Sequence, residues 1–261
     1  MKRCFAVLLF ISQSCLAQQW EAEIMTGVAG YNGDLTEHFF SPKSIGPSAG
    51  FNLKYNCNDL FILRGGIIWG HVMANDKNNH QADLKNRNLN FATNIVEANF
   101  CLEVNLFEPD FFTVYPYVFV GIGVFHFNPY THDDDGNKVY LRPLGTEGQG
   151  LSRYPNRKPY SLTQLCLPFG GGMKFYLNKR CDLVYELGGR SLFTDYLDDV
   201  SKTYVTTQTL LSVNRPKAAE LAYRQTGAAY PNEGDIRGNP KIKDWYFVSG
   251  LKLLIRLGKN R

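Results

Sequence analysis

Hydrophobic and polar residues alternate almost without interruption over residues 95–106, with Val96 on the apolar face and Glu97 on the polar face. A period of two predicts a β-strand that has one face of each kind. A break at Glu108-Pro109-Asp110 separates this segment from a second strand at residues 114–127. Each arm of this antiparallel hairpin exceeds the usual soluble strand of about 5–6 residues. Each arm also suits the roughly 9–11 residues that a tilted barrel strand needs to cross a bilayer.

The remaining chain shows the same pattern in six further segments. These predicted strands lie at residues 20–31, 51–55, 60–72, 162–177, 182–193 and 245–257. The connections alternate in length along the chain. Those near residues 57, 109 and 179 are short, and those at 33–47, 75–92, 129–160 and 194–243 are long. The sequence therefore predicts eight strands joined by alternating short and long connections.

Two local features modify this picture. Pro168 lies inside the sixth strand, where it removes a ladder donor, so a β-bulge is expected beside it. The segment Pro216–Gln225, within the longest connection, is expected to hold a short helix.

An even number of strands with alternating short and long connections is typical of an outer-membrane barrel. A soluble sandwich with Greek-key connections has no reason to alternate so regularly. The mean hydropathy of -0.25 does not indicate a helical membrane protein. Transmembrane barrels escape that criterion because half of each strand faces a polar lumen. We therefore predict an all-β fold, an eight-stranded antiparallel transmembrane β-barrel with short periplasmic turns, long extracellular loops and both termini in the periplasm.

Residues 1–17 have the pattern of a secretory signal peptide. Lys2-Arg3 is the charged region, residues 5–11 form the apolar core, and Ser14–Ala17 offers a small-residue cleavage site. A lipoprotein attached through Cys15 is the alternative, although the three residues before it fit a lipobox poorly. The barrel domain then covers residues 18–261 and lies in the outer membrane. The formal charge of +4 is too small and too dispersed to indicate binding to nucleic acid.

The lumen of an eight-stranded barrel is only just wide enough to be filled by side chains. The alternation directs acidic and basic residues into it, and isolated buried charges would be costly, so mutual ion pairs are expected. The predicted interior charged network consists of Glu97, Glu103, Glu186, Lys54, Arg64, Lys174, Arg190, Lys252 and Arg256. A packed polar plug is the interpretation that this strand number favours, and a selectivity pore lined by the same charges is the alternative.

Candidate chemistry is sparse. The run Asp133–Gly136 could hold calcium, but it lacks the ligand spacing of an EF-type loop, and a solvated loop tip is the simpler interpretation. Asp195, Asp198 and Asp199 could form a paired-carboxylate site or could cap their own loop. The five histidines lie in no recognisable nucleophile motif. We expect no catalytic residues, no metal and no cofactor, and therefore no enzyme.

Four cysteines follow the signal peptide, in an oxidising compartment. Cys101 and Cys166 are expected to point inward as small buried side chains. Cys57 and Cys181 fall in short turns on opposite sides of the barrel, too far apart for the ~5.5 Å Cα spacing of a disulfide. Two alternatives remain: one of these two residues binds a periplasmic partner through an intermolecular disulfide, or both are free thiols.

Three segments carry a resemblance to a known family. The runs at residues 115–129, 143–150 and 194–201 resemble a Bacteroidetes outer-membrane β-barrel family that includes PorG, a component of the type IX secretion system. The similarity extends from Trp20 to Leu257. It implies a monomeric barrel that does not conduct the cargo. Such a barrel would hold the periplasmic ring of a PorK-like lipoprotein and a PorN-like protein at the outer membrane, within a larger secretion or gliding-motility complex.

Two other functions remain open from the sequence. A small outer-membrane barrel could bind or transport an external ligand through the long loops at residues 130–160 and 194–243. A lipid-modifying barrel enzyme is the third possibility, although no catalytic motif supports it.

Overall fold

The computed structural model describes residues 20–38, 41–107, 112–225 and 229–257. The predicted signal peptide at residues 1–17 and the predicted turn at residues 108–110 lie outside the described residues.

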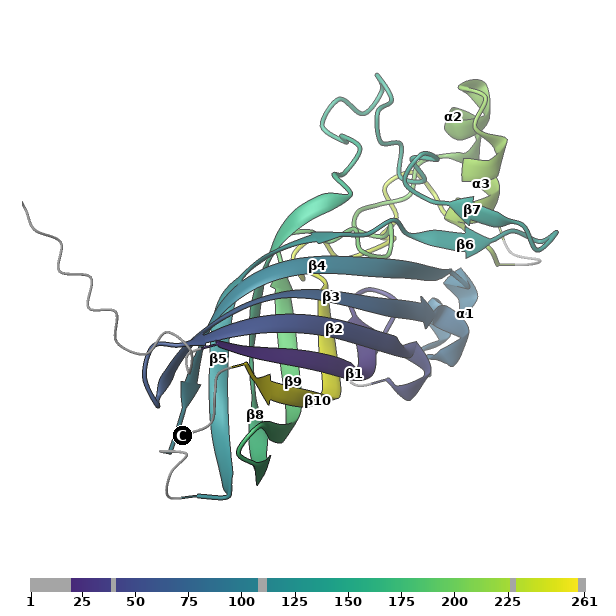
Figure 1. Ribbon diagram of the computed structural model, residues 1–261. Helices are drawn as coiled ribbons and strands as arrows, with labels where there is room; N and C mark the ends of the chain where they lie inside the picture. The colour runs from purple at the N-terminus through teal and green to yellow at the C-terminus, as the bar shows by residue number, and fades with distance from the viewer. Residues whose placement is uncertain (1–19, 39–40, 108–111, 226–228, 258–261) are drawn as a thin grey trace, which may run out of the picture.

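Eight long antiparallel strands form one sheet. They are β1 (Trp20–Asn32), β2 (Ile45–Asn56), β3 (Phe61–Asn75), β4 (Asn90–Asn105), β5 (Val114–His126), β8 (Thr163–Asn178), β9 (Cys181–Leu192) and β10 (Trp245–Arg256). Their order in the sheet is β3-β2-β1-β10-β9-β8-β5-β4, and a further pairing of β3 with β4 closes the cylinder (Figure 1). This confirms the predicted closed eight-stranded antiparallel barrel.

The barrel is apolar outside and polar inside. In β4, 53% of the Phe100 surface is exposed, whereas Glu103, on the opposite face of the same strand, is 0% exposed. Each of the eight barrel strands presents large apolar side chains on its outer face. Examples, one from each strand in chain order, are Ile24, Phe51, Ile67, Phe100, Ile122, Leu165, Tyr185 and Leu251. In water, burying apolar surface is favourable, so a soluble protein places such side chains inside. Their exposure on the outer face is the distribution expected of a barrel that lies in lipid.

The start of β2 differs from the prediction. The strand begins at Ile45, whereas the sequence places a loop up to about Ser48. Pro47 lies inside the strand, opposite Val28 of β1, and the register with β3 shifts between Ile45 and Ser48. Proline is tolerated there because, at a β-bulge, the ladder does not need the backbone N–H donor that proline lacks.

The predicted bulge at Pro168 is wrong. The pairs Val120–Phe169 and Gly123–Cys166 keep one register across this point, and only the two intervening pairs are missing from the ladder between β5 and β8. The missing N–H of Pro168 thus interrupts the pairing without shifting it. The register of β8 against β9 shifts instead at the far end of the strand, between Tyr176 and Asn178.

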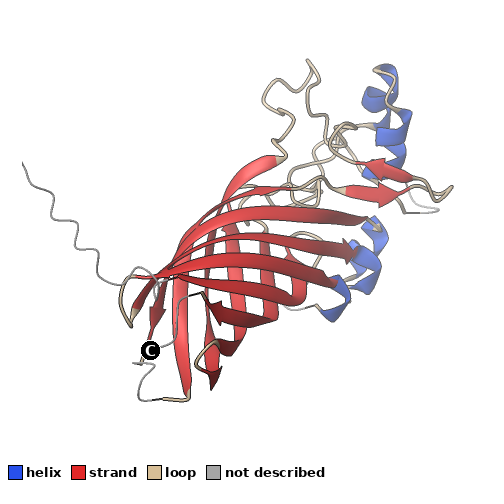
Figure 2. Cartoon of the chain, viewed as in Figure 1, coloured by secondary structure: helices blue, strands red, loops and turns tan. Residues whose placement is uncertain are grey.

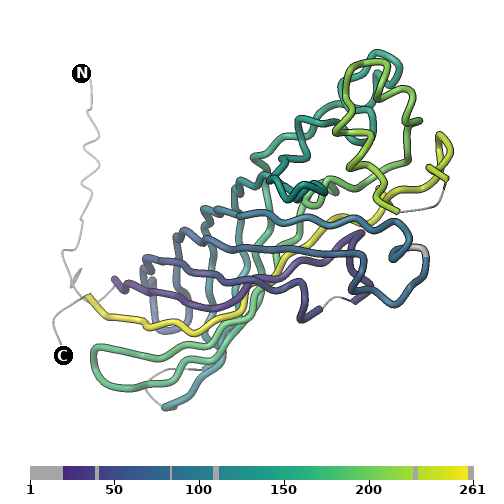
Figure 3. The backbone as a smooth tube through the Cα atoms, turned by 90° about the vertical axis from the view of Figure 1, so that its right-hand side faces the viewer, coloured from purple at the N-terminus to yellow at the C-terminus, as the bar shows by residue number. Residues whose placement is uncertain are grey.

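Short and long connections lie at opposite ends of the barrel. At the short-turn end, the N–H of Leu257 donates to the carbonyl oxygen of Trp20 at 3.0 Å, so the described chain begins and ends at the same rim. Figure 3 shows the purple and yellow ends of the described tube together at this rim.

The long connections gather at the other end, where we call the described residues of 33–44, 76–89, 127–162 and 193–244 the cap. The cap contains η2 (Pro42–Ser44), η3 (Asp76–Asn78), α1 (Ala82–Arg87), β6 (Tyr130–His132), β7 (Lys138–Tyr140), α2 (Thr207–Ser212) and α3 (Pro216–Ala222). Figure 2 shows the helices at this end only. The helix expected within residues 216–225 is confirmed as α3, and α2 was not predicted. In the described part of the chain, none of the helices has the length and apolar character to span a membrane.

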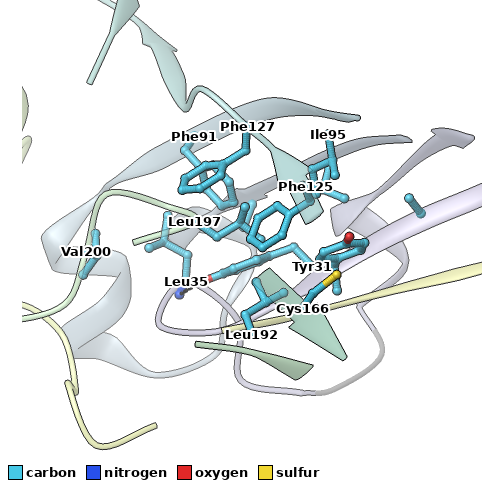
Figure 4. Packing of buried hydrophobic residues seen from close by; sticks show 14 of the residues in the cluster. Tyr31, Leu35, Phe91, Ile95, Phe125, Phe127, Cys166, Leu192, Leu197 and Val200 are labelled. Carbon is cyan, nitrogen blue, oxygen red and sulfur yellow. Dashed lines mark hydrogen bonds between the residues drawn. The ribbon is translucent and has the colours of Figure 1, made fainter. Parts of the chain in front are cut away.

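An aromatic core joins the cap to the barrel (Figure 4). The rings of Phe125 and Phe127 are stacked with centroids 5.4 Å apart, and Phe127 stacks on Tyr160 of the cap at 6.1 Å. Tyr160 in turn stacks on Tyr196 at 4.8 Å. Leu197 packs into the same buried cluster. The cap therefore continues the hydrophobic core at the long-connection end of the barrel and covers that end of the lumen.

Candidate functional site

The lumen holds a charge-balanced network of buried side chains. The strands direct six carboxylates and six cationic groups inward. They are Glu21, Glu23, Glu97, Glu103, Asp182 and Glu186 with Lys54, Arg64, Lys174, Arg190, Lys252 and Arg256. Arg256 is partly exposed at the short-turn end, and the other eleven are buried. The formal charges of this set cancel, which a low-dielectric interior requires.

Glu103 of β4 is the centre of the network. Its carboxylate lies 3.1 Å from Nζ of Lys54 and 3.4 Å from Nη1 of Arg64, and it also pairs with Lys174. Lys174 donates a further hydrogen bond to Oδ1 of Asn105 at 2.8 Å. One carboxylate on β4 thus binds cations from β2, β3 and β8 across the lumen.

The remaining ion pairs extend this centre into a continuous chain. Arg64 Nη1 lies 2.5 Å from Glu186, which also lies 2.7 Å from Nζ of Lys252. Lys252 lies 2.9 Å from Glu23, and Glu23 lies 2.7 Å from Nζ of Lys54. Together with Glu103, this chain of contacts returns to Lys54 and links six strands.

A second group of contacts lies around Glu97. Its Oε2 atom lies 3.0 Å from Nε of Arg190 and accepts a hydrogen bond from Tyr246 at 2.5 Å, and its Oε1 atom accepts one from Asn99 at 2.6 Å. At the short-turn end, Arg256 pairs with Asp182 at 2.5 Å. The structure thus places all nine residues of the predicted interior network in ion pairs.

This arrangement fills the lumen. Beside Glu97, the gap lined by Ala29, Ile68, Gly70 and Tyr246 leaves no room for a water molecule. Buried ion pairs gain their stability only with close geometry and additional hydrogen bonds. Glu97 and Glu186 accept such additional bonds from neutral side chains, and Glu103 is bound by three cations. The geometry is that of a packed polar plug.

A second network lies in the cap, where two of the sequence runs noted above meet. Oγ1 of Thr146 donates to Oδ2 of Asp199 at 2.6 Å, and the hydroxyl of Tyr196 donates to Oε2 of Glu147 at 3.1 Å. Oδ1 of Asp199 accepts a hydrogen bond from the hydroxyl of Tyr160 at 2.8 Å. The runs 143–150 and 194–201 therefore build one buried structure, although they are about fifty residues apart.

Glu147 organises this cap network. Its Oε1 atom accepts hydrogen bonds from the backbone N–H groups of Ser201 at 2.9 Å and Lys202 at 3.1 Å, and it pairs with Nη1 of Arg237 at 2.9 Å. Glu147 is 0% exposed. Hydrogen bonds to a buried charged group are among the stronger ones in proteins, so this carboxylate fixes three cap segments relative to one another.

Left-handed backbone conformations explain the glycines of the first run. Gly145, Gly148 and Gly150 have φ angles of +61°, +78° and +77°. Side chains at such angles are strained, and glycine has none. The three turns bring the Glu147 carboxylate back against Ser201.

Buried carboxyl groups of the cap have raised pKa values. Burial raises the pKa of Asp195 to about 7 and that of Asp199 to about 6. Burial, with the neighbouring Asp34 carboxylate, holds the pKa of Asp198 well above its usual range. Oδ1 of Asp198 accepts the N–H of Val200 at 2.9 Å, and its Oδ2 accepts the hydroxyl of Tyr31 at 2.5 Å. Asp198 therefore caps its own loop, which is one of the two roles that the sequence suggests for this aspartate run.

The acidic run at residues 133–136 is tied to the cap. Asp133 pairs with Lys217 of α3 at 3.0 Å and accepts the N–H of Asn137 at 2.7 Å, and Asp134 pairs with Arg224 at 3.0 Å. Among the described residues, His, Cys, Asp and Glu side chains form no group of three or more that could hold a metal ion.

The four described cysteines are unpaired. Cys57 is exposed, Cys181 is half-buried, and Cys101 and Cys166 are buried in the lumen. Cys57 follows β2 and Cys181 begins β9, and β1 and β10 lie between these strands. A Cβ atom on Gly121 would lie 2.6 Å from Sγ of Cys101, so glycine on β5 leaves the space that this thiol fills.

Comparison with known proteins identifies a family. The model of a domain of unknown function, DUF6089, matches residues 2–142, just over half of the chain. The chain belongs to the DUF6089 family. No curated protein sequence matches it.

Solved structures resemble the DUF6089 chain at low identity. Neisserial surface protein A is 10% identical with a TM-score of 0.44, covering 91% of this chain and 96% of that one. Ail of Yersinia pestis is 9% identical with a TM-score of 0.39, covering 91% and 99%. The outer membrane protein OprG from Pseudomonas aeruginosa is 11% identical with a TM-score of 0.40, covering 92% and 98%. These likenesses concern the fold alone.

Sequence reasoning about this DUF6089 barrel missed several members of the two networks. Glu23 and Asp182 belong to the lumen set, and the alternation along β1 and β9 is the signal that places them there. Glu147 and Arg237 of the cap lie 90 residues apart, and no local pattern links them.

Proposed function

We propose that this DUF6089 protein is a non-conducting structural barrel of the outer membrane that anchors a periplasmic complex. The observation that carries the proposal is the filled lumen, in which Glu103, Glu186 and Glu97 are each bound by buried cations. A barrel whose interior is packed cannot conduct a protein cargo, so it acts through its surfaces. In this proposal the short-turn end and both termini face the periplasm, and the cap faces outward.

We further propose that the complex is a type IX secretion system. The bound partners would be the periplasmic ring proteins, a PorK-like lipoprotein and a PorN-like protein. The support is the resemblance of residues 115–129, 143–150 and 194–201 to the barrel family that includes PorG. Two of these runs, 143–150 and 194–201, build the buried cap network. The resemblance therefore includes residues that hold the cap together. We propose no enzymatic activity.

Deleting the protein tests this function. We expect loss of secretion of many C-terminally tagged cargoes, because the ring would no longer be held at the outer membrane. Full-length protein purified from detergent-solubilised membranes should bring down both ring proteins. Normal secretion together with a ring that still fractionates with the outer membrane would refute the proposal.

The ordered cap favours one second candidate, the binding of an external ligand. Large apolar side chains of the cap are exposed on a folded loop structure. They are Leu211 and Val213 at the end of α2 and Ile236 in another part of the cap. A deletion that removed only one uptake or adhesion activity, and left cargo secretion intact, would support this candidate instead.

We also propose that Cys57 or Cys181 forms a disulfide with a periplasmic partner. Both thiols lie at the short-turn end, and neither has a disulfide partner among the described residues. On non-reducing gels of whole envelopes we expect a higher-mass species that disappears in Cys57→Ser or in Cys181→Ser. The buried Cys101→Ser variant is the matched control and should retain the species. Absence of the higher-mass species from all four proteins would show that the thiols of Cys57 and Cys181 are free.

A further inference from the structure

A groove crosses the outer wall of the barrel close to the short-turn end. It has a volume of about 640 Å³, and β1, β2, β3 and β4 contribute to it. Its walls are Trp20, Phe51, Leu53, Tyr55, Ile67 and Phe100, and Gly65 forms its floor. We call it the Gly65 groove. It faces the surroundings of the barrel, on the opposite side of the wall from the ion-pair network.

A missing side chain creates the groove. Gly65 pairs with Leu53 of β2 on one side and Phe100 of β4 on the other, and both of these outward side chains are exposed. A Cβ atom at Gly65 would meet nothing within 4 Å. Strand glycine costs stability relative to residues with a side chain, so this open position is not explained by packing within the chain.

The lining of the groove is apolar along its length and amphipathic at one end. None of its lining side chains is charged. Trp20 and Tyr55 lie at the short-turn rim, with their rings edge to face at 5.1 Å between centroids. Tryptophan and tyrosine in this position mark the level of the lipid headgroups. The groove therefore runs from the membrane interface into the hydrocarbon region.

The dimensions of the groove restrict what can occupy it. From Tyr55 to Phe51 the groove follows four residue-to-residue steps of β2, or about 13 Å at roughly 3.3 Å per step. This is close to half of the ~30 Å hydrocarbon core, the depth of a single leaflet. Across the wall, the gap at Gly65 lies between the exposed side chains of Leu53 and Phe100.

We propose that the Gly65 groove binds one acyl chain of a membrane phospholipid from the leaflet at the short-turn end. The glycerol and headgroup would lie beside Trp20 and Tyr55, and the chain would extend past Leu53 and Phe100 toward Ile67. The site is independent of the secretion function proposed above, because it depends only on the outer wall of the barrel.

Filling the groove tests the proposal. The full-length barrel in detergent is mixed with dioleoylphosphatidylcholine, and native mass spectrometry counts the lipids that remain bound. We expect one retained lipid per wild-type barrel and roughly tenfold weaker retention for Gly65→Leu, because the new side chain displaces several methylene groups from the wall. Ala49→Leu is the matched control, since Ala49 is exposed on β2 outside the groove.

Each outcome decides the proposal. Retention lost in Gly65→Leu and kept in Ala49→Leu supports it. Equal retention in all three proteins, or equal loss in both variants, would mean that only general contact with the wall was measured, and the proposal would fail. A change from dimer to monomer in Gly65→Leu would instead identify the groove as an interface between copies. Unfolding in urea should show that both variants are folded. For Gly65→Leu the reason is the open space around residue 65, and for Ala49→Leu it is the exposure of residue 49.

Discussion

The variant Glu103→Gln is expected to lose about 3–5 kcal/mol of barrel stability, the usual cost of breaking a buried ion pair by removing one partner. Glu103 neutralises Lys54, Arg64 and Lys174, all of which are buried. The amide keeps the shape of the carboxylate but leaves an uncompensated positive charge in the lumen. Urea unfolding of the barrel in lipid vesicles measures the effect as a lowered midpoint.

A second substitution separates lost charge balance from lost packing. In Glu103→Gln/Lys174→Met the charges balance again, since Lys54 keeps Glu23 and Arg64 keeps Glu186. Part of the lost stability should therefore return. Glu220→Gln, the same chemical change on the partly exposed surface of α3, is the control and should shift the midpoint little. A midpoint for Glu103→Gln equal to that of Glu220→Gln would show that the network does not stabilise the barrel.

The variant Glu147→Ala is expected to open the cap and leave the barrel folded. It removes the acceptor for the N–H groups of Ser201 and Lys202 and the carboxylate that pairs with buried Arg237. Unsatisfied buried donors cost about 1–3 kcal/mol each, and an unpaired charge costs more. The strand ladders do not depend on this residue, so opening should be local.

Limited proteolysis of the detergent-solubilised protein measures this effect. Cleavage within residues 143–160 and 194–225 should become at least tenfold faster in Glu147→Ala, while the strands remain protected. Glu233→Ala, which removes an exposed cap ion pair with Arg153, is the matched control and should be cleaved at the wild-type rate. Unchanged cleavage of Glu147→Ala would mean that other contacts hold the cap.

The barrel wall could be predicted because its two faces meet opposite environments. Lipid outside and ion pairs inside give each strand a strict alternation, as Phe100 and Glu103 show in β4. The prediction was wrong where backbone chemistry disturbs that pattern. The sequence predicts a loop at Pro47, although a bulge accommodates this residue in β2, and it predicts a bulge at Pro168 that the strand does not need.

The cap could not be predicted in the same way, because its structure depends on contacts between distant residues. Thr146 meets Asp199, and Glu147 meets Arg237, through turns that alternation does not describe. The helix α2 was missed because its threonine-rich sequence has weak helical propensity. One local signal was present: Thr206 accepts the N–H of Thr209 at 3.1 Å and thus caps the helix.

The distribution of charge among the strands restricts how the protein enters a membrane. The hairpin of β2 and β3 carries Lys54 and Arg64 on its inner face, whereas their acidic partners lie on β1, β4 and β9. Alone in hydrocarbon, this hairpin would expose two unneutralised cations, at a cost of several kcal/mol each. Insertion one hairpin at a time is therefore disfavoured. The opposed strands must come together before they leave water, and catalysed assembly at a protein template would meet that requirement.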